Sequence, residues 1–200
     1  ADDNASGTAA LLELARLWSI SVANGYPPDR SLLFVAFTAE EKGLLGSEYF
    51  INSEAAENRN IILNINMDMI GKSIKYSFVE GMSGMAIDDF KEDTTKREKY
   101  VYLLNNGKVT KPLVKASKSF AKQYEGFQVD RRPGLLNKMI YKTSSDHKHF
   151  HKKGIPILVW FTGTHPDYHT PRDTPEKIDY RNMTTITRII YLTSGVILIE

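Results

Sequence analysis

The sequence has 200 residues, which predicts one domain, and its 42% hydrophobic and 25% charged residues are close to the average of globular proteins. Lys and Arg number 26 against 24 Asp and Glu, so the net charge of +2 gives no general attraction for nucleic acid or anionic membrane. The absence of Cys excludes disulfides, thiol catalysis and Cys-ligated zinc. No apolar run reaches the ~18–20 residues that cross a bilayer.

The first third of the chain alternates predicted helices and strands. Residues 6–22 carry a broad apolar stripe at helical spacing, which Asn24-Gly25 ends. The continuous apolar runs 32–37 and 61–67 have the length of strands covered on both faces, and 39–52 between them predicts a helix. This order is typical of an α/β layered sheet.

The rest of the chain is less regular at first. Residues 72–110 hold two short strand candidates, 75–79 and 100–104, joined by a charged stretch that predicts a surface loop, and we interpret this region as an insertion or a sheet edge. Further on, the sequence predicts a helix over 112–124, a buried strand over 155–161 and a closing helix over 181–199.

Acids and histidines recur where the predicted strands end. Glu40 and Glu41 follow the strand at 32–37, Asp68 follows the one at 61–67, and His169 lies a few residues after the one at 155–161. Asp3 immediately precedes the first helix. Because ligands of open α/β sheets bind beyond the carboxyl ends of the strands, we expect these side chains to meet at one edge.

A carboxylate cluster of this kind suits a divalent cation. Crowded carboxylates repel one another unless a cation neutralises them, and carboxylates with imidazole suit Zn²⁺. In the adjacent pair Glu40-Glu41, one side chain can bind the metal while the other takes a proton from water, a division that metal-dependent hydrolysis requires.

Each feature alone has a plainer explanation. Asp2-Asp3 can cap a helix, Glu40-Glu41 can be a solvated first turn, and His169 can be an ordinary loop histidine. The histidines at 147, 149 and 151 either form a separate metal site or belong to a solvated helix face, and the second interpretation is favoured. The joint arrangement favours the metal site at the sheet edge.

Four sequence blocks, at residues 1–7, 39–47, 66–71 and 168–174, together with a weaker one at 145–150, carry a family resemblance. In their order and spacing the chain resembles the co-catalytic zinc aminopeptidases, which include bacterial secreted leucyl aminopeptidases and, more distantly, glutamate carboxypeptidase and glutaminyl cyclase. The resemblance implies a three-layer α/β/α sandwich with a central mixed, mostly parallel sheet.

The resemblance also implies roles for individual residues. Asp3 matches the carboxylate that bridges two zinc ions, and the Asp3–Asn4 peptide bond is expected to be cis. Glu41 and His169 resemble the other ligands of one zinc, and Asp68 resembles a ligand of the second. Glu40 matches the general base.

Three further residues match supporting positions of the family. Tyr168 lies where some members have a tyrosine that hydrogen-bonds the tetrahedral intermediate. Asp146 corresponds to a structural or substrate-side acid, and Asp173 to an acid that orients a loop or a ligand.

One element of the family pattern lies outside the sequence. The family has a His-x-Asp motif upstream of the bridging Asp, which supplies a histidine to the zinc also bound by Asp68. We therefore expect residues 1–200 to be a single zinc-peptidase catalytic domain without its N-terminal part. The resemblance implies two Zn²⁺ in the intact enzyme and one or two here, and leaves open whether these residues alone are active.

The activity implied is zinc-dependent removal of the N-terminal residue of a peptide with a free amino terminus, in a secreted or periplasmic protein. Two alternatives stay open: a glutaminyl cyclase, which uses one zinc held by Asp, Glu and His, and a non-catalytic receptor-like relative. The pair Glu40-Glu41 favours the peptidase over the cyclase. Residues 80–99 and 130–142 are candidates for lining the specificity pocket.

Overall fold

The computed structural model describes residues 1–73, 99–130 and 144–198. The described residues do not include the strand candidate at 75–79 or most of the charged loop. They include only residue 99 of the specificity segment 80–99 and only residue 130 of the segment 130–142. The described elements are, in chain order, η1 (Asp2–Ser6), α1 (Gly7–Ala23), α2 (Leu45–Ile51), α3 (Glu54–Glu57), β1 (Asn64–Met67), β2 (Tyr100–Asn105), α5 (Lys111–Ala121), β3 (Gln128–Asp130), α7 (His147–Lys152), β4 (Ile157–Phe161), η3 (Pro175–Lys177) and α8 (Tyr180–Leu198).

The described strands form one mixed sheet in the order β1-β4-β2-β3. β1 pairs with β4 in parallel, with Asn64 opposite Ile157, and β2 pairs with β3 in parallel. β2 and β4 are antiparallel, with Tyr102 opposite Phe161. β2 therefore lies inside the sheet and not at its edge, although it belongs to the region that we interpreted as an insertion or sheet edge.

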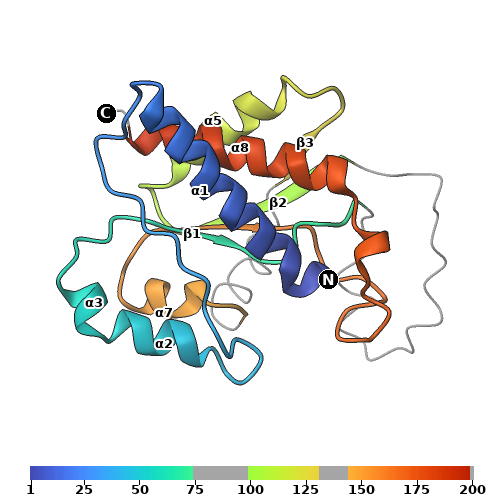
Figure 1. The fold of residues 1–200 in the computed structure, drawn as a ribbon, viewed down its shortest axis with the longest axis horizontal. Coiled ribbons are helices and arrows are strands. Elements are labelled where there is room, and N and C mark those ends of the chain that lie inside the picture. Colours follow the sequence, from blue (N-terminus) through green and yellow to red (C-terminus); the bar gives the residue numbers. More distant parts are fainter. Residues whose placement is uncertain (74–98, 131–143, 199–200) are drawn as a thin grey trace.

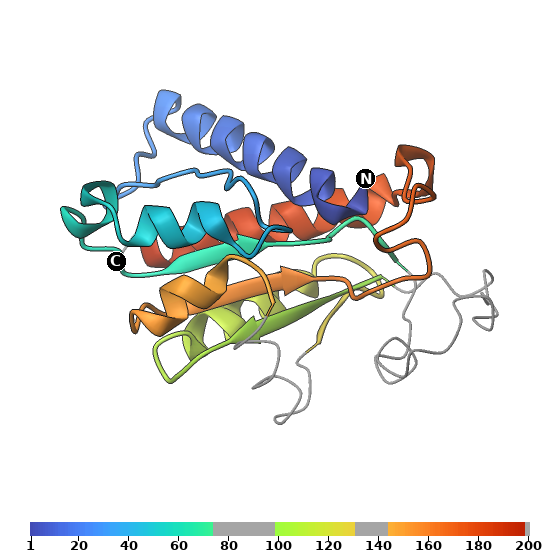
Figure 2. The same cartoon turned by 90° about the horizontal axis from the view of Figure 1, so that it is seen from below.

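The two faces of the sheet are covered by different helices, which makes three layers (Figures 1 and 2). Alternate residues of β4 point to opposite faces, as the pleat of a strand requires. Leu158 and Trp160 pack with buried residues of α1, α5 and α8, whereas Ile157 and Val159 pack with α2, α3 and α7. The α/β/α arrangement is thus confirmed.

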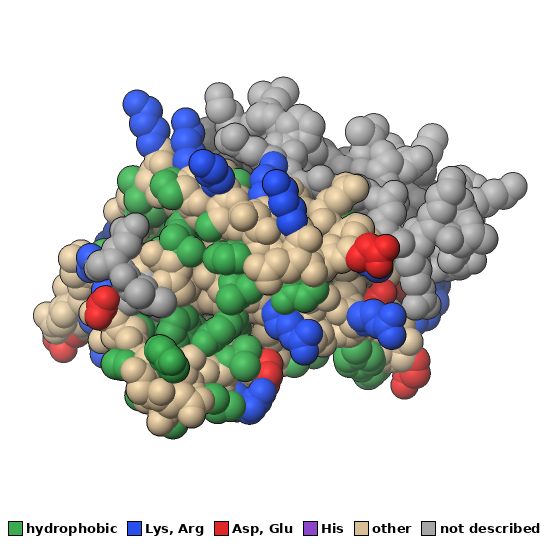
Figure 3. Space-filling model, turned by 90° about the horizontal axis from the view of Figure 1, so that it is seen from above, with side chains coloured by type: hydrophobic (Ala, Val, Ile, Leu, Met, Phe, Trp, Pro, Cys, Tyr) green, Lys and Arg blue, Asp and Glu red, His purple; other side chains and the backbone are tan. Residues whose placement is uncertain are grey.

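The layer of α1, α5 and α8 is held by apolar contacts and by a few buried polar ones. Between α5 and α8, Ser117 Oγ lies 2.9 Å from Thr193 Oγ1, and both side chains are buried. On the outer face of this layer, Lys and Arg side chains gather toward one margin, and hydrophobic side chains are exposed beside them (Figure 3). Leu12 and Val22 of α1 are 69% and 50% exposed. Among the described residues, no helix combines the length and the apolarity needed to cross a bilayer.

The predicted strand over 32–37 was wrong. These residues form an irregular segment, and Leu33 and Phe34 are 53% and 37% exposed. A strand needs a neighbour whose N–H and C=O groups pair with its own, and none of the described strands pairs with this segment. The apolar composition predicts a strand here, but the described residues supply no partner for it.

Two further expectations need correction. The helix predicted over 39–52 begins only at Leu45, because a turn at 39–44 comes first. The histidines of α7 do not form a solvated face: His147 and His149 are 1% and 6% exposed, because the helix packs between α2 and the sheet. They do not form a metal-binding group with other described residues either.

Candidate metal centre

Three side chains from distant parts of the chain meet at one end of the sheet. Asp3 precedes α1, Glu41 precedes α2, and His169 lies between β4 and η3. His169 Nε2 lies 3.1 Å from Asp3 Oδ2 and 3.1 Å from Glu41 Oε1. One ligand atom from each lies within 4.8 Å of the others, and the described residues contain no second group of this kind. The structure thus brings together three of the four predicted metal ligands.

The Asp3 carboxylate is positioned by its neighbour Asn4. Asn4 Nδ2 donates to the carbonyl of Met67 at 3.1 Å, and Asn4 Oδ1 accepts from the backbone N–H groups of Gly7 and Met69, each at 3.1 Å. One amide side chain thus joins the start of α1 to the end of β1. The Asp3–Asn4 peptide bond is cis, as expected.

Glu40 and Glu41 lie in a tight turn before α2. The N–H groups of Gly43 and Leu44 both donate to the carbonyl of Glu40, at 3.0 and 2.8 Å. Gly46 N–H donates to the carbonyl of Thr38 at 3.1 Å, and a Cβ at position 46 would lie 2.5 Å from that oxygen. The close approach of the two backbones therefore requires a glycine at position 46. The turn places Glu40 near Asp68, which follows β1.

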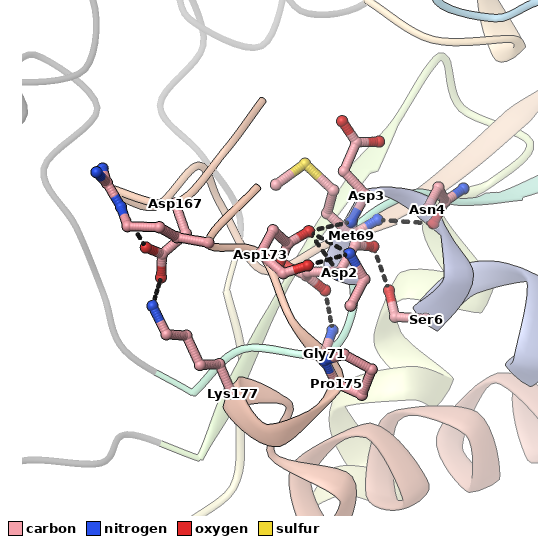
Figure 4. A network of polar contacts seen from close by, with 12 residues as sticks. Asp2, Asp3, Asn4, Ser6, Met69, Gly71, Asp167, Asp173, Pro175 and Lys177 are labelled. Atoms are coloured by element: carbon pink, nitrogen blue, oxygen red, sulfur yellow. Dashed lines mark hydrogen bonds and ion pairs between the residues drawn. The ribbon is translucent and has the colours of Figure 1, made fainter. Parts of the chain in front are cut away.

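The segment that we call the His169 loop (residues 162–179) is tied to the start of the chain by one carboxylate. Asp173 Oδ2 accepts from the terminal ammonium group of Ala1 at 2.6 Å and from the backbone N–H groups of Asp2 and Asp3 at 2.8 and 3.1 Å (Figure 4). Burial alone would raise the pKa of Asp173, but these hydrogen bonds outweigh it and lower the pKa to about 2. Asp173 therefore orients the Asp3 segment against the loop that carries His169.

Tyr168 lies directly against its neighbour. Its ring stacks on the imidazole of His169, with centroids 3.8 Å apart and planes at 24°. Burial, followed by the charges of Asp3 and Glu41, raises the pKa of Tyr168 to about 12. The phenol is therefore protonated at neutral pH and can act as a hydrogen-bond donor at the site.

Asp68 lies beside the three-residue group but is not part of it. Its backbone N–H continues the ladder of β1 by donating to the carbonyl of Trp160 at 3.1 Å. Burial raises the pKa of the Asp68 carboxyl, and a hydrogen bond with Ser145 partly offsets this. Asn66 Nδ2 donates to the same hydroxyl at 3.1 Å, so Ser145 is fixed next to Asp68.

The carboxylates at the site raise one another's pKa. Burial and then the charge of Asp68 raise the pKa of Asp3 to about 6. Burial, again followed by Asp68, raises the pKa of Glu40 to about 7, and Asp146 contributes to that shift. Burial also raises the pKa of Asp146, against a hydrogen bond with Ser47. A divalent cation among these groups would remove the repulsion that disfavours their charged forms.

A groove of about 1310 Å³ opens beside the site. Its walls come from α1, residues 30–37, residues 59–68 and a few residues of α8, and they are more apolar than polar. At one end it reaches the carboxylates of the site, namely Asp3, Glu40, Glu41, Asp68 and Asp146. Three predicted metal ligands, Asp3, Glu41 and Asp68, therefore face the same groove as the predicted base Glu40.

The comparisons with known proteins agree with this picture. The model of peptidase family M28 matches residues 1–194. The chain belongs to peptidase family M28. Aminopeptidase YwaD of Bacillus subtilis is 30% identical over 189 residues, which are 89% of this chain and 33% of that protein. A probable glutamate carboxypeptidase of Zea mays, VP8, is 28% identical over 175 residues, 86% of this chain and 22% of that protein.

A solved structure supports the fold as well. The structure of a zinc aminopeptidase from Bacillus subtilis matches with a TM-score of 0.67 and 26% identity, over 98% of this chain and 42% of that chain. The chain thus spans less than half the length of these relatives. The family resemblance that the sequence blocks indicated is confirmed.

Several residues that shape the site were not among those predicted. The sequence predicts the cis bond before Asn4 but none of the side-chain contacts of Asn4, Ser145, Asp2 and His165. For Asn4, the signal available was its place directly after Asp3 and before a helix, where Asn commonly caps. Nothing in the sequence indicates that Ser145 lies next to Asp68.

Proposed function

We propose that this chain carries the metal site of a zinc-dependent exopeptidase that releases the N-terminal residue of a peptide. The observation that carries the proposal is the convergence of Asp3, Glu41 and His169, which come from three segments far apart in the sequence. If these three residues were only a helix cap, part of a solvated turn and a loop histidine, nothing would require their side chains to lie close together. Membership of a peptidase family and similarity to aminopeptidases point the same way.

The donor set fits zinc. Two carboxylate oxygens and one imidazole nitrogen are a usual ligand set for Zn²⁺ in a catalytic site, where a further position is left for water. When bound by Asp3, Glu41 and His169, Zn²⁺ would lower the pKa of a water and polarise a carbonyl group. We propose that Asp68, with its raised pKa and its place beside Asp3, contributes to a second metal position.

Glu40 is proposed as the general base. Burial raises its pKa to about 7, which is well matched to accepting a proton near neutral pH. In this role the Glu40 carboxylate takes a proton from the attacking water and returns it to the leaving amine. The neighbouring Glu41 would hold the metal, so the two glutamates would have different roles.

Tyr168 is proposed as a donor to the oxyanion. Its phenol is protonated at neutral pH, and the stacking of its ring on His169 holds the side chain next to the metal ligands. A hydrogen bond that forms as negative charge develops on the carbonyl oxygen would favour the transition state over the substrate.

A second candidate is a glutaminyl cyclase. The specific observation in its favour is that the described group contains one Asp, one Glu and one His, with Asp68 outside it. That is the ligand set of a single-zinc acyltransferase. The adjacent glutamates at 40 and 41 favour the peptidase, because bacterial cyclases usually carry Glu-Asp at this place.

An assay with two substrates separates the candidates. The purified protein is incubated with zinc and either an amino-acid anilide with a free α-amine or a peptide with an N-terminal glutamine. The peptidase proposal predicts release of the aniline, loss of that activity with a chelator, and recovery with Zn²⁺. Cyclisation of the glutamine without anilide hydrolysis would support the cyclase. Absence of bound zinc would instead support a receptor-like relative.

A further inference from the structure

Asp2 is wholly buried, with 0% of its surface exposed, and its carboxylate contacts two segments next to the site. It is the direct neighbour of Asp3. Its Oδ1 accepts from the backbone N–H of Gly71 at 2.7 Å, on the segment that follows Asp68. Its Oδ2 lies 3.3 Å from Nε2 of His165, in the His169 loop.

The contact with Gly71 is close enough to constrain the sequence. A Cβ at position 71 would lie 2.8 Å from Asp2 Oδ1, so any other residue there would push the carboxylate away. In Figure 4, the carboxylate of Asp2 points to Gly71, whereas that of Asp3 points away from the network. Asp2 thus anchors the segment and leaves the Asp3 carboxylate available to a metal.

On the other side of Asp2, the polar group that the described residues place next to Oδ2 is the His165 imidazole. The His165 side chain is 2% exposed, and neither Asp2 Oδ2 nor His165 Nε2 has a hydrogen-bond partner among the described residues. Burying a carboxylate oxygen or a ring nitrogen without a hydrogen bond costs free energy. The ion-pair contact between Asp2 Oδ2 and His165 Nε2 offsets part of this cost, so each side chain stabilises the buried position of the other. This dependence ties the position of Asp2 to that of the loop four residues before His169.

From these contacts we infer that Asp2 and His165 are positioning residues that set the separation of Asp3 and His169, and through it the affinity for the metal. The inference rests on the proposed function, because it requires a divalent cation at Asp3, Glu41 and His169. It concerns residues that touch neither the metal nor the substrate.

The experiment measures zinc affinity by competition with a chromophoric chelator, at neutral pH, on the metal-free protein. Asp2→Asn keeps the acceptor for Gly71 but loses the charge toward His165, and His165→Phe keeps a ring but loses both nitrogens. Each substitution is expected to raise the Kd for Zn²⁺ about 10-fold. This is the low end of the loss of metal affinity seen when a residue that orients a metal ligand is replaced. The double variant is expected to raise it by less than the product of the two effects, because both substitutions remove the same contact.

A matched control separates positioning from stability. Thr193→Val removes the buried hydroxyl contact with Ser117, far from the site, and is expected to lower the melting temperature of the metal-free protein with no change in the zinc Kd. A merely structural role for Asp2 and His165 would give this same pattern.

The outcomes are distinguishable. If the unchanged protein does not bind zinc, the proposed function fails and this inference with it. If it binds zinc but the folded Asp2→Asn and His165→Phe variants keep the Kd within about twofold, the inference alone fails. If one variant does not fold by circular dichroism, the other decides, and failure of both to fold would contradict a positioning role.

Discussion

Two segments bring ligands to the same site, and they are held in place very differently. The His169 loop is fixed by buried polar contacts, in which Asp173 accepts from the terminal ammonium group of Ala1 and from the backbone N–H groups of Asp2 and Asp3, and His165 faces Asp2. The segment that we call the Glu40 segment (residues 30–44) has exposed apolar side chains in its first half, and local hydrogen bonds hold the turn in its second half. The comparison shows that a site can combine a ligand from a loop held by buried polar contacts with a ligand from a more open segment.

The largest expected effect falls on the Glu40 segment. Glu40→Gln keeps the size of the side chain but removes the base, so the kcat of peptide hydrolysis is expected to fall by about 10²–10⁴-fold. Zinc content, measured by atomic absorption, is expected to stay unchanged. The assignment of Glu40 as the base is wrong if the variant keeps most of its kcat.

The next effect tests the His169 loop. His169→Ala removes a proposed metal ligand whose Nε2 lies 3.1 Å from both carboxylates. Zinc affinity is therefore expected to fall by more than the ~10–100-fold that is typical when a residue orienting a metal ligand is replaced. The measurement is the same chelator competition. Asp167→Asn, in the same loop but in an exposed ion pair with Arg172 and Lys177, is the control and is expected to leave the affinity unchanged.

Removal of the metal is expected to make stability depend on pH. The pKa values of Asp3 and Glu40 are raised to about 6 and about 7, above their values in the unfolded chain, because their charged forms are disfavoured in the fold. The metal-free protein should therefore lose stability as the pH rises from about 4 to about 7, and Zn²⁺ should restore it above pH 7. Thermal melts in a chelator and in excess zinc measure this. A melting temperature that rises over this range without zinc would contradict it.

A smaller effect tests the anchor of the His169 loop. The pKa of Asp173 is lowered to about 2, so its charged form stabilises the fold above the unfolded pKa, and this contribution is lost as the pH falls through about 2. Asp173→Asn is expected to cost about 2 kcal/mol at neutral pH. The difference in urea-denaturation free energy should shrink between pH 4 and pH 2. A constant difference would mean that the charge is not what stabilises the loop.

The smallest effect belongs to the open part of the Glu40 segment. Leu33 is 53% exposed, so Leu33→Ser is expected to change the free energy of unfolding by no more than about 0.5 kcal/mol. Leu158, which is wholly buried in the sheet, is the contrast: Leu158→Ala is expected to cost about 2–5 kcal/mol. A cost above about 1.5 kcal/mol for Leu33→Ser would show that this side chain is buried in solution.

The same contrast explains what could be predicted from the sequence. The helices α1, α5 and α8 and the buried strand β4 follow from apolar periodicity, because each has a partner within the described residues. Residues 32–37 have the composition of a strand, but strand formation depends on a neighbour that composition does not reveal. The convergence of Asp3, Glu41 and His169 was predicted from their places at strand and helix ends.

Other features of the site depend on contacts between residues far apart in the sequence. Nothing in the pattern places Asp173 over the backbone of Asp2 and Asp3, and the histidines of α7 alternate in a way that also fits an exposed helix. Their burial follows from packing against α2 and the sheet, which a single sequence does not encode in any local signal.

The central claim is that Asp3, Glu41 and His169 together hold a divalent cation. Crystals of the protein grown with zinc, with data collected on both sides of the zinc absorption edge, test it directly. The account predicts an anomalous peak between His169 Nε2 and the carboxylate oxygens of Asp3 and Glu41, and its loss in His169→Ala. A peak at the α7 histidines instead, or none at this site in zinc-saturated crystals, would contradict it.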